Sequence, residues 1–267
     1  MLKFLSFGSG SSGNCYLLYT ETDALMIDIG VGLRTLKKHF HDYGLSLDSV
    51  HNILITHDHA DHVKSVGSIS RDYHLPVYTT REVHQGIDRN YCVRHKVEAD
   101  QRRIIEKGQP FMVGEFRVTA FGVPHDSTDN VGYLIEYGDV TFCIMTDIGH
   151  LTEEHQKMIS AANYLVIEAN HAKEMLRTGP YPQYLKDRIS GPNGHLSNEE
   201  CGMALAQYAT PHLRHVWLCH LSEDNNHPEL ARKTIEQILH AHGIVAGKDF
   251  MLDVLKRKSP GEICELV

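Results

Sequence analysis

The chain has 267 residues, of which 42% are hydrophobic and 22% charged, and it carries a net charge of −8. This balance supports a packed core and excludes a disordered chain, while the negative charge argues against a protein that coats nucleic acid with its whole surface. No apolar stretch approaches the roughly 20 residues of a membrane-spanning helix, and glycine follows the start too closely for a secretory signal, so we expect a cytoplasmic protein without a membrane span.

Short apolar strands, separated by glycine and aspartate turns, begin the chain. Strands are predicted over residues 3–7, 15–19 and 24–29. A helix is expected over residues 32–43, where Gly44 ends it. Residues 52–56 have the continuous apolar character of a buried strand.

Strands and helices alternate through the rest of the chain. Ser197 and Glu200 form a capping box at the start of a helix. Pro228 suits the first turn of a last helix, which ends near residues 242–243. Further strands are predicted over residues 77–80, 116–121, 132–137, 140–145, 164–167 and 215–221. Because no linker or repeat separates these elements, they indicate one α/β domain over residues 1–267.

A glycine-rich loop over residues 8–13 matches the G-x-G-x-x-G pattern of dinucleotide-binding proteins. That function requires a helix directly after the loop, because the helix N-terminus holds the pyrophosphate. Residues 14–19 have a strand pattern instead. The loop therefore either only connects two strands or borders the active site and offers amides to phosphate.

Histidine is unusually frequent, with 20 residues, whereas the six cysteines are spread out without a C-x-x-C pair. Metal ligation is the leading explanation for a histidine excess. In a chain of this length without a secretory signal, the cysteines are interpreted as reduced thiols.

The strongest signal is a histidine–aspartate cluster directly after the buried strand at residues 52–56. His57 and His59 are two residues apart, so on an extended chain they point the same way. Asp61 and His62 follow a turn, where the chain can bend into a helix. Two pairs of ligand-type side chains suit two adjacent metal ions better than one, and the alternative is a polar loop with incidental histidines.

Three more candidate ligands stand at the ends of predicted strands. His125 follows the strand over residues 116–121, and Asp147 follows the strand over residues 140–145. His220 ends the strand over residues 215–221. Open α/β sheets bind ligands at the carboxyl ends of their strands. Each residue alone could be an ordinary loop residue, but with the first cluster the three form a coherent set.

The H-x-H-x-D-H run with these later residues resembles the metallo-β-lactamase-fold hydrolases, and the resemblance covers nearly the whole chain. It implies an αββα four-layer sandwich that binds two divalent ions of zinc, manganese or iron. The ligand set implied by the family pattern is His57, His59 and His125 for one ion, Asp61, His62 and His220 for the other, and Asp147 as a bridge between them.

Three further stretches narrow the resemblance. Residues 193–200 and 218–222 are similar to a region of the RNase Z type phosphodiesterases in which a histidine precedes a capped helix. Together with residues 7–15 they resemble the YycJ (WalJ) subfamily, which implies a 5′-to-3′ exonuclease acting on single- or double-stranded DNA. The short segment between His125 and Asp147 leaves no room for the protruding arm of tRNA-processing RNase Z.

By the same resemblance, Asp61 and His195 are catalytic. Asp61 would orient the attacking water or take its proton, and His195 would donate a proton to the leaving oxygen or neutralise the phosphate. A merely local role at a helix N-terminus is the alternative for His195. Residues 81–107 and 184–188 contain basic side chains that either contact DNA or form a solvated face, and we favour the solvated face for residues 81–107.

Two other functions share these features. A small-molecule hydrolase, acting on a thioester or a lactone, would use the same ions but has no obvious use for His195. A non-catalytic binding module would keep the metals for stability, but structural sites are usually closed zinc tetrahedra. The sequence leaves the oligomeric state open.

Overall fold

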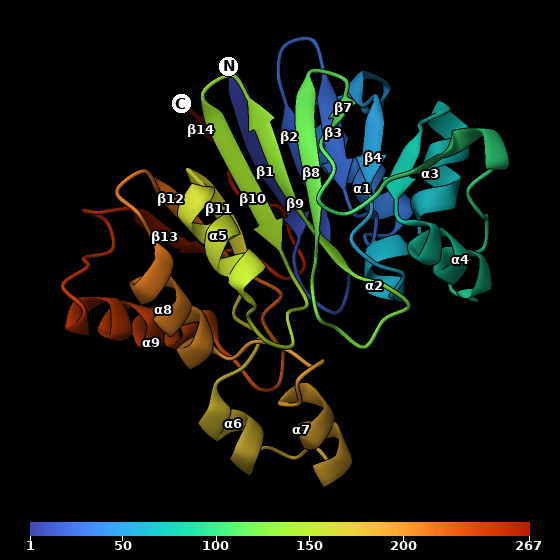
Figure 1. Ribbon diagram of the computed structural model, residues 1–267. Helices are drawn as coiled ribbons and strands as arrows, with labels where there is room; N and C mark the ends of the chain where they lie inside the picture. The colour runs from blue at the N-terminus through green and yellow to red at the C-terminus, as the bar shows by residue number, and fades with distance from the viewer. The chain divides into compact units, whose positions relative to one another are not determined.

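The computed structural model describes residues 1–267, which form two compact units. The first unit contains Met1–Ala120, Ser127–Val131 and Lys256–Val267, and the second contains Phe121–Asp126 and Gly132–Leu255. Each unit consists of a β-sheet with helices packed against it (Figure 1). The single domain expected over residues 1–267 stays a prediction.

The sheet of the first unit has the strand order β14-β1-β2-β3-β4-β5-β6. Its strands are β1 (Leu2–Gly8), β2 (Cys15–Tyr19), β3 (Ala24–Ile27), β4 (Asn52–Leu54), β5 (Val77–Thr79), β6 (Arg102–Ile104) and β14 (Cys264–Leu266). Pairing is antiparallel from β14 to β3 and parallel from β3 to β6. The strands β7 (Phe111–Val113) and β8 (Phe116–Gly122) form an antiparallel hairpin. Because β3, β4, β5 and β6 are parallel, their carboxyl ends all lie at one edge of the first sheet.

Helices cover one face of this sheet. They are α1 (Leu33–Asp42), α2 (Ala60–Val63), α3 (Val66–Tyr73) and α4 (Arg81–Arg89), with 3-10 turns at Leu47–Ser49 and Ala99–Gln101. Phe40 of α1, Ile69 of α3 and Val83 of α4 belong to one buried hydrophobic cluster, which includes Leu17 and Ile53 of the sheet. The core of the first unit thus lies between the sheet and its helices.

The second unit repeats this plan. Its strands, in the order β13-β12-β11-β10-β9, are Met251–Val254, His215–Cys219, Tyr164–Glu168, Val140–Met145 and Val131–Tyr137. The strands β9 and β10 are antiparallel, and β10 to β13 are parallel. Helices α5 (Glu153–Ala161), α8 (Asn198–Tyr208) and α9 (Pro228–Ala241) pack on the sheet through one buried cluster. The helices α6 (Lys173–Thr178) and α7 (Gln183–Ile189) lie apart from those three in Figure 1.

The predicted strands are all present, with ends that differ by a few residues. The capping box of Ser197 and Glu200 starts α8 as predicted, and α9 begins at Pro228. Helix α5 escaped prediction although it also has a capping box, because the third position holds His155 rather than glutamate or glutamine. The helices α3, α4, α6 and α7 and the strands β6, β7, β13 and β14 were likewise not predicted.

His155 makes the stability of the second unit depend on pH. Its side chain is buried, its Nδ1 accepts the Thr152 N–H at 2.9 Å, and its Nε2 lies 3.0 Å from the Gly122 carbonyl. Burial lowers the pKa of His155 to about 4, against an ordinary value of about 6.5. The unfolded chain therefore takes up a proton below about pH 6.5, whereas the folded chain resists it down to about pH 4, so stability falls as the pH drops through this window.

We expect His155→Gln to lower this pH dependence. Wild-type protein should lose up to about 3 kcal/mol of unfolding free energy through His155 between pH 6.5 and pH 4, and the variant should lack that contribution. Urea unfolding at pH 7 and pH 4.5 measures it, with the exposed His212→Gln as a control. Equal pH dependence in wild type and His155→Gln would contradict the assignment.

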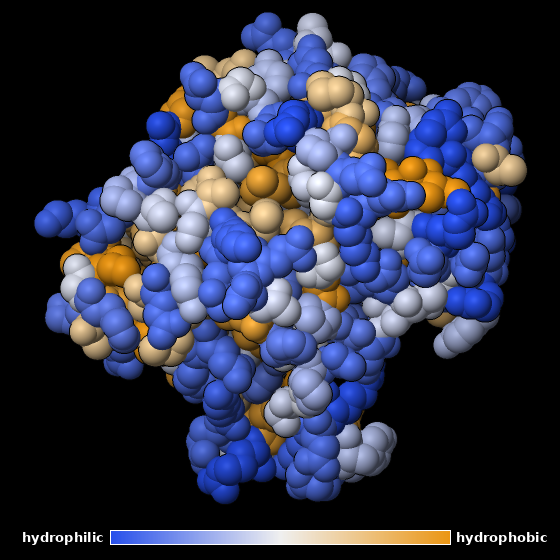
Figure 2. Space-filling view, in the orientation of Figure 1, coloured by the Kyte–Doolittle hydropathy of each residue, from blue (hydrophilic) through white to orange (hydrophobic).

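The surface shown in Figure 2 is mostly hydrophilic, with scattered apolar groups, as is usual for a folded protein. No helix combines the length and the apolar composition that a membrane crossing needs. All six cysteines are free thiols, and four of them are buried. The basic side chains of residues 81–107 are partly engaged within the first unit: Arg102 pairs with Asp88 and Lys107 with Asp129.

Candidate metal centre and catalytic histidine

Strained backbone marks the carboxyl ends of the parallel strands in both units. Asp28 directly follows β3, Asp147 follows β10 and His220 follows β12. Their φ angles are 60°, 56° and 53°, in the left-handed region that residues other than glycine rarely adopt. Such strain persists where the surrounding structure holds a residue in place, and it is concentrated at functional sites. The strand ends therefore carry the candidate site.

The first unit brings together the predicted histidine–aspartate cluster. The ring of His57 lies 4.0 Å from that of His62 and 4.8 Å from that of His59, measured between centroids. His59 is the N-cap of α2, and Asp61 and His62 lie within that helix. The predicted change from extended chain to helix after His59 is thus confirmed, and it turns four ligand-type side chains toward one region of the unit.

Asp28 orients His62, and sequence reasoning missed it. The Nδ1 of His62 lies 2.7 Å from Asp28 Oδ2, and both side chains are fully buried. The Asp28 carboxylate also accepts the N–H and the hydroxyl of Thr56, both at 2.8 Å. Because a nitrogen that faces a carboxylate carries its hydrogen, the lone pair of the His62 ring is on Nε2, where the Asn14 amide lies 2.9 Å away. An aspartate at the end of a buried strand was the available signal.

The glycine-rich loop packs beside this cluster through Asn14. The Asn14 amide Nδ2 lies 2.9 Å from His62 Nε2 and 3.2 Å from Asp61 Oδ2, and the Asn14 N–H donates to the Asp61 carbonyl at 2.7 Å. A Cβ on Gly30 would lie 1.6 Å from that same carbonyl oxygen, so only glycine fits there. Strand β2, and not a helix, follows the loop, so a dinucleotide-binding function of the loop is excluded as predicted. The contacts of Asn14 with Asp61 instead join the loop to α2.

The second unit gathers the other predicted residues around Asp147. Its Oδ1 lies 3.6 Å from His125 Nε2, 3.5 Å from His220 Nδ1 and 3.7 Å from His195 Nδ1. Asp147, Glu168, His195 and His220 each offer one ligand atom, and these atoms lie within 4.8 Å of one another. The predicted ligands thus divide between the units, with His57, His59, Asp61 and His62 in the first and His125, Asp147 and His220 in the second.

Glu168 is the residue of this cluster that sequence reasoning missed. Its Oε1 accepts from His195 Nδ1 at 2.8 Å and from His220 Nδ1 at 3.0 Å. Its Oε2 accepts the N–H groups of Ile148 at 2.8 Å and Leu196 at 3.0 Å. Burial by itself raises the pKa of Glu168, but the charge and hydrogen bonds of the two histidines outweigh it and lower that pKa to about 2. Glu168 is therefore a fixed anion that orients both imidazoles.

His195 differs from its neighbours because its side chain is 18% exposed, against 4% for His220 and 1% for His125. Burial alone lowers the pKa of His195, but the charge and hydrogen bond of Glu168 raise it above its ordinary value. Since Glu168 holds the Nδ1 hydrogen, the Nε2 atom is the one that can hold and release a second proton. This arrangement suits a general acid.

The ring orientations fit metal ligation. His125 faces the Gly194 carbonyl with Nδ1 at 3.0 Å, as His62 faces Asp28 and His220 faces Glu168. Metal-binding histidines usually donate their second ring N–H to a carboxylate or a carbonyl in this way. A set of imidazoles and carboxylates suits zinc, manganese or iron. The residues present therefore fit divalent metal ions.

Two acidic neighbours of the ligands are engaged elsewhere. Asp58, within the histidine run, accepts the N–H of Thr128 at 3.0 Å and its hydroxyl at 2.6 Å. Asp126, next to His125, accepts from Arg188. Neither residue belonged to the predicted ligand set. Arg188 belongs to residues 184–188, for which the sequence left open either a contact with DNA or a solvated face, and in the structure it pairs with Asp126 of the same unit.

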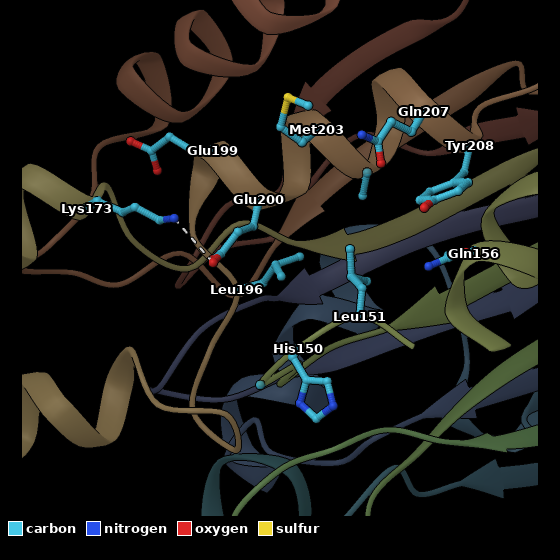
Figure 3. A pocket seen from close by; sticks show the side chains of 12 residues that line it. His150, Leu151, Gln156, Lys173, Leu196, Glu199, Glu200, Met203, Gln207 and Tyr208 are labelled. Carbon is cyan, nitrogen blue, oxygen red and sulfur yellow. Dashed lines mark hydrogen bonds and ion pairs between the residues drawn. The ribbon is translucent and has the colours of Figure 1, made fainter. Parts of the chain in front are cut away.

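A cavity of about 330 Å³ lies along α8 in the second unit (Figure 3). Leu151, Leu196 and Met203 contribute its apolar wall, and Lys173 and Glu200 form an ion pair at its edge. The cavity contains none of the predicted ligands. Leu196 nevertheless connects its wall to His195, the next residue in the chain.

Comparison with known proteins agrees with this geometry. Residues 23–221 match the family described as "Beta-lactamase superfamily domain", and the chain belongs to this family. An exodeoxyribonuclease, YycJ of Bacillus anthracis, is 34% identical over 98% of both chains. The crystal structure of YhfI from Bacillus subtilis, a metallo-β-lactamase fold protein, aligns with a TM-score of 0.72 at 17% identity over 98% of both chains. Zinc-bound PqqB from Methylobacterium extorquens gives 0.73 at 16% identity, over 99% of this chain and all of the other. The predicted family and fold class are confirmed.

Proposed function

We propose that this chain is a metal-dependent exodeoxyribonuclease that removes nucleotides from the 5′ ends of DNA. The observation that carries this function is the His195–Glu168 pair, with a ring-to-carboxylate distance of 2.8 Å. It supplies an oriented proton donor in addition to the predicted metal ligands, as a poor alkoxide leaving group requires. The 34% identity to a relative named as an exodeoxyribonuclease, over 98% of both chains, supports the same activity.

We further propose that two divalent ions bind per chain and that the two units together form one domain. One ion would be held by His57, His59 and His125, and the other by Asp61, His62 and His220, with Asp147 shared. The family match over residues 23–221 supports this, because it includes all seven residues. Zinc and manganese are the first candidates for these ions, and zinc is the metal bound in the PqqB structure.

The chain's own residues would divide the chemistry. When bound, the divalent ions activate a water molecule and neutralise charge on the phosphate. Asp61 would orient that water, with its own carboxylate held near Asn14 at 3.2 Å. His195 would donate the proton on Nε2 to the leaving 3′ oxygen, while Glu168 keeps the ring oriented through Nδ1.

One assay separates this function from its alternatives. Single- and double-stranded DNA labelled at the 5′ end should release labelled mononucleotides in the presence of manganese, and chelation should abolish the release. A thioester and a lactone, tested in parallel, should remain intact. Cleavage of the thioester or lactone without any release from DNA would contradict the proposal and favour the small-molecule hydrolase.

A cytoplasmic location is part of the same proposal. The six free thiols of the chain support it, because thiols stay reduced in that compartment.

A further inference from the structure

A second cavity, of about 320 Å³, lies between α6, α7 and the start of α8 in the second unit. Three cationic side chains line it, those of Lys173, Arg177 and Lys186. Two carboxylates, Asp187 and Glu200, also line it. The excess of positive charge and the size of the cavity are suited to an anionic group of a ligand.

Both carboxylates already have hydrogen-bond donors. Asp187 accepts from the Gln183 amide at 2.8 Å. Glu200 accepts the N–H of Ser197 at 3.0 Å and its hydroxyl at 2.6 Å, as part of the capping box of α8. Lys186 donates to the Arg177 carbonyl at 2.8 Å, which leaves further N–H groups on its ammonium. Lys173 is paired with Glu200 at 3.3 Å and Arg177 with Glu174 at 2.6 Å. Lys186 is therefore the cation with the most capacity for a ligand, and Lys173 keeps N–H groups beyond its ion pair.

His171 is the buried polar group of this cavity. Its side chain lines the cavity, the residue is only 2% exposed, and its Nδ1 atom is buried without a hydrogen-bond partner. Leaving such an atom unpaired is unfavourable, and an incoming oxygen atom would give it a hydrogen-bond partner. Burial lowers the pKa of His171 to about 4, so the ring is neutral near pH 7 and carries one N–H to donate.

The cavity adjoins His195 through the backbone. His171 pairs with Ser197 in an isolated β-bridge, and its carbonyl accepts the N–H of Asn198 at 2.9 Å. Lys173 and Glu200 line this cavity and also the one along α8, where Figure 3 shows their ion pair. A strand whose reacting phosphate lies at His195 therefore has this cavity within reach of a neighbouring phosphate.

We propose that this cavity binds a phosphate group of the DNA substrate, with Lys173, Lys186 and the His171 imidazole as donors. The inference rests on the proposed nuclease function and adds a phosphate-binding subsite that none of the predicted metal ligands lines. Lys186 belongs to the basic segment over residues 184–188, whose other cations include Arg188, already paired with Asp126. The phosphate is either internal to the strand or at its 5′ end.

The test is the salt dependence of DNA binding to the metal-loaded enzyme. A single-stranded oligonucleotide with phosphorothioate linkages, which slow cleavage, is titrated between 50 and 200 mM salt. Lys186→Gln should raise the Kd several-fold at low salt and lower the slope of log K against log salt by about 0.7, the value for one phosphate contact on a single strand. The control Lys233→Gln, on α9 and paired with Glu229, should leave both unchanged.

A second pair of variants tests the buried histidine. His171→Leu should weaken binding, whereas His171→Asn, which keeps an N–H donor near the position of Nδ1, should restore it, with thermal unfolding used to confirm that both fold. A loss with both 5′-phosphorylated and 5′-hydroxyl oligonucleotides indicates an internal phosphate, and a loss with the phosphorylated one alone indicates the terminal phosphate.

Wild-type Kd and salt slope in both Lys186→Gln and His171→Leu, in a preparation whose wild type cleaves DNA, would overturn the subsite and leave the nuclease function intact. A wild type that neither binds nor cleaves DNA would overturn both.

Discussion

His195→Ala should lower kcat for DNA cleavage by about 10²- to 10⁴-fold, the usual contribution of a positioned general acid. The reason is that Nε2 of this ring, oriented by Glu168 through Nδ1, is the proposed proton donor to the leaving oxygen. Metal content should stay close to the wild-type value, because His195 is outside the predicted ligand set. The midpoint of thermal unfolding should fall, because the buried Glu168 carboxylate loses one of its two imidazole donors. Rates are measured with excess manganese and saturating 5′-labelled DNA.

The control for this prediction is His212→Ala, which removes an exposed histidine of the same unit. It should cleave DNA at the wild-type rate. A His195→Ala variant with wild-type kcat would show that this histidine has only a local role at the start of α8. Loss of bound metal in the same variant would instead identify His195 as a ligand.

Glu168→Ala should have the largest effect on stability, lowering the free energy of unfolding by about 3–5 kcal/mol, as expected when one partner of a buried charged network is removed. The variant leaves four N–H donors unsatisfied, on His195, His220, Ile148 and Leu196. Activity should fall as well, since both imidazoles lose their orientation, and such supporting groups contribute about 10- to 100-fold. Urea unfolding and DNA cleavage are measured on the same preparation.

Glu229→Ala is the matched control for Glu168→Ala. Glu229 is a glutamate of the same unit whose side chain is 72% exposed and pairs with Lys233 at 3.3 Å. Removal of an exposed ion pair changes stability by about 1 kcal/mol at most. If Glu168→Ala unfolds at the same urea concentration as Glu229→Ala, Glu168 does not orient the two histidines in the way described.

The first half of the site could be predicted because its signal is local. Four side chains that can bind a metal lie within six residues, directly after a buried strand. The strand pattern therefore predicts their place in the fold. His125, Asp147 and His220 were predictable as polar residues that end apolar runs. Asp28 and Glu168 are also polar residues at the ends of apolar runs, but their role depends on the histidines that they face. That pairing is a tertiary contact, which periodicity and spacing do not specify.

The elements that escaped prediction have physical reasons too. The capping box of helix α5 has His155 at the third helical position, where glutamate or glutamine is usual, and helix α3 spans only Val66–Tyr73. Helices α6 and α7 are also short, and α7 has no fully buried residue to give an apolar stripe. Packing and capping in the folded chain hold such short helices, because isolated helices of this length are unstable. Residues of α6 and α7 also line the cavity at His171, so the proposed phosphate subsite could not be predicted from the sequence either.

The most direct test of the account is the metal content of the purified chain, combined with anomalous diffraction at the zinc and manganese absorption edges. The proposal predicts two divalent ions per chain, which the seven predicted ligand residues would hold. An ion-free pocket in metal-supplemented protein, or a lone ion bound by the second unit alone, would contradict it.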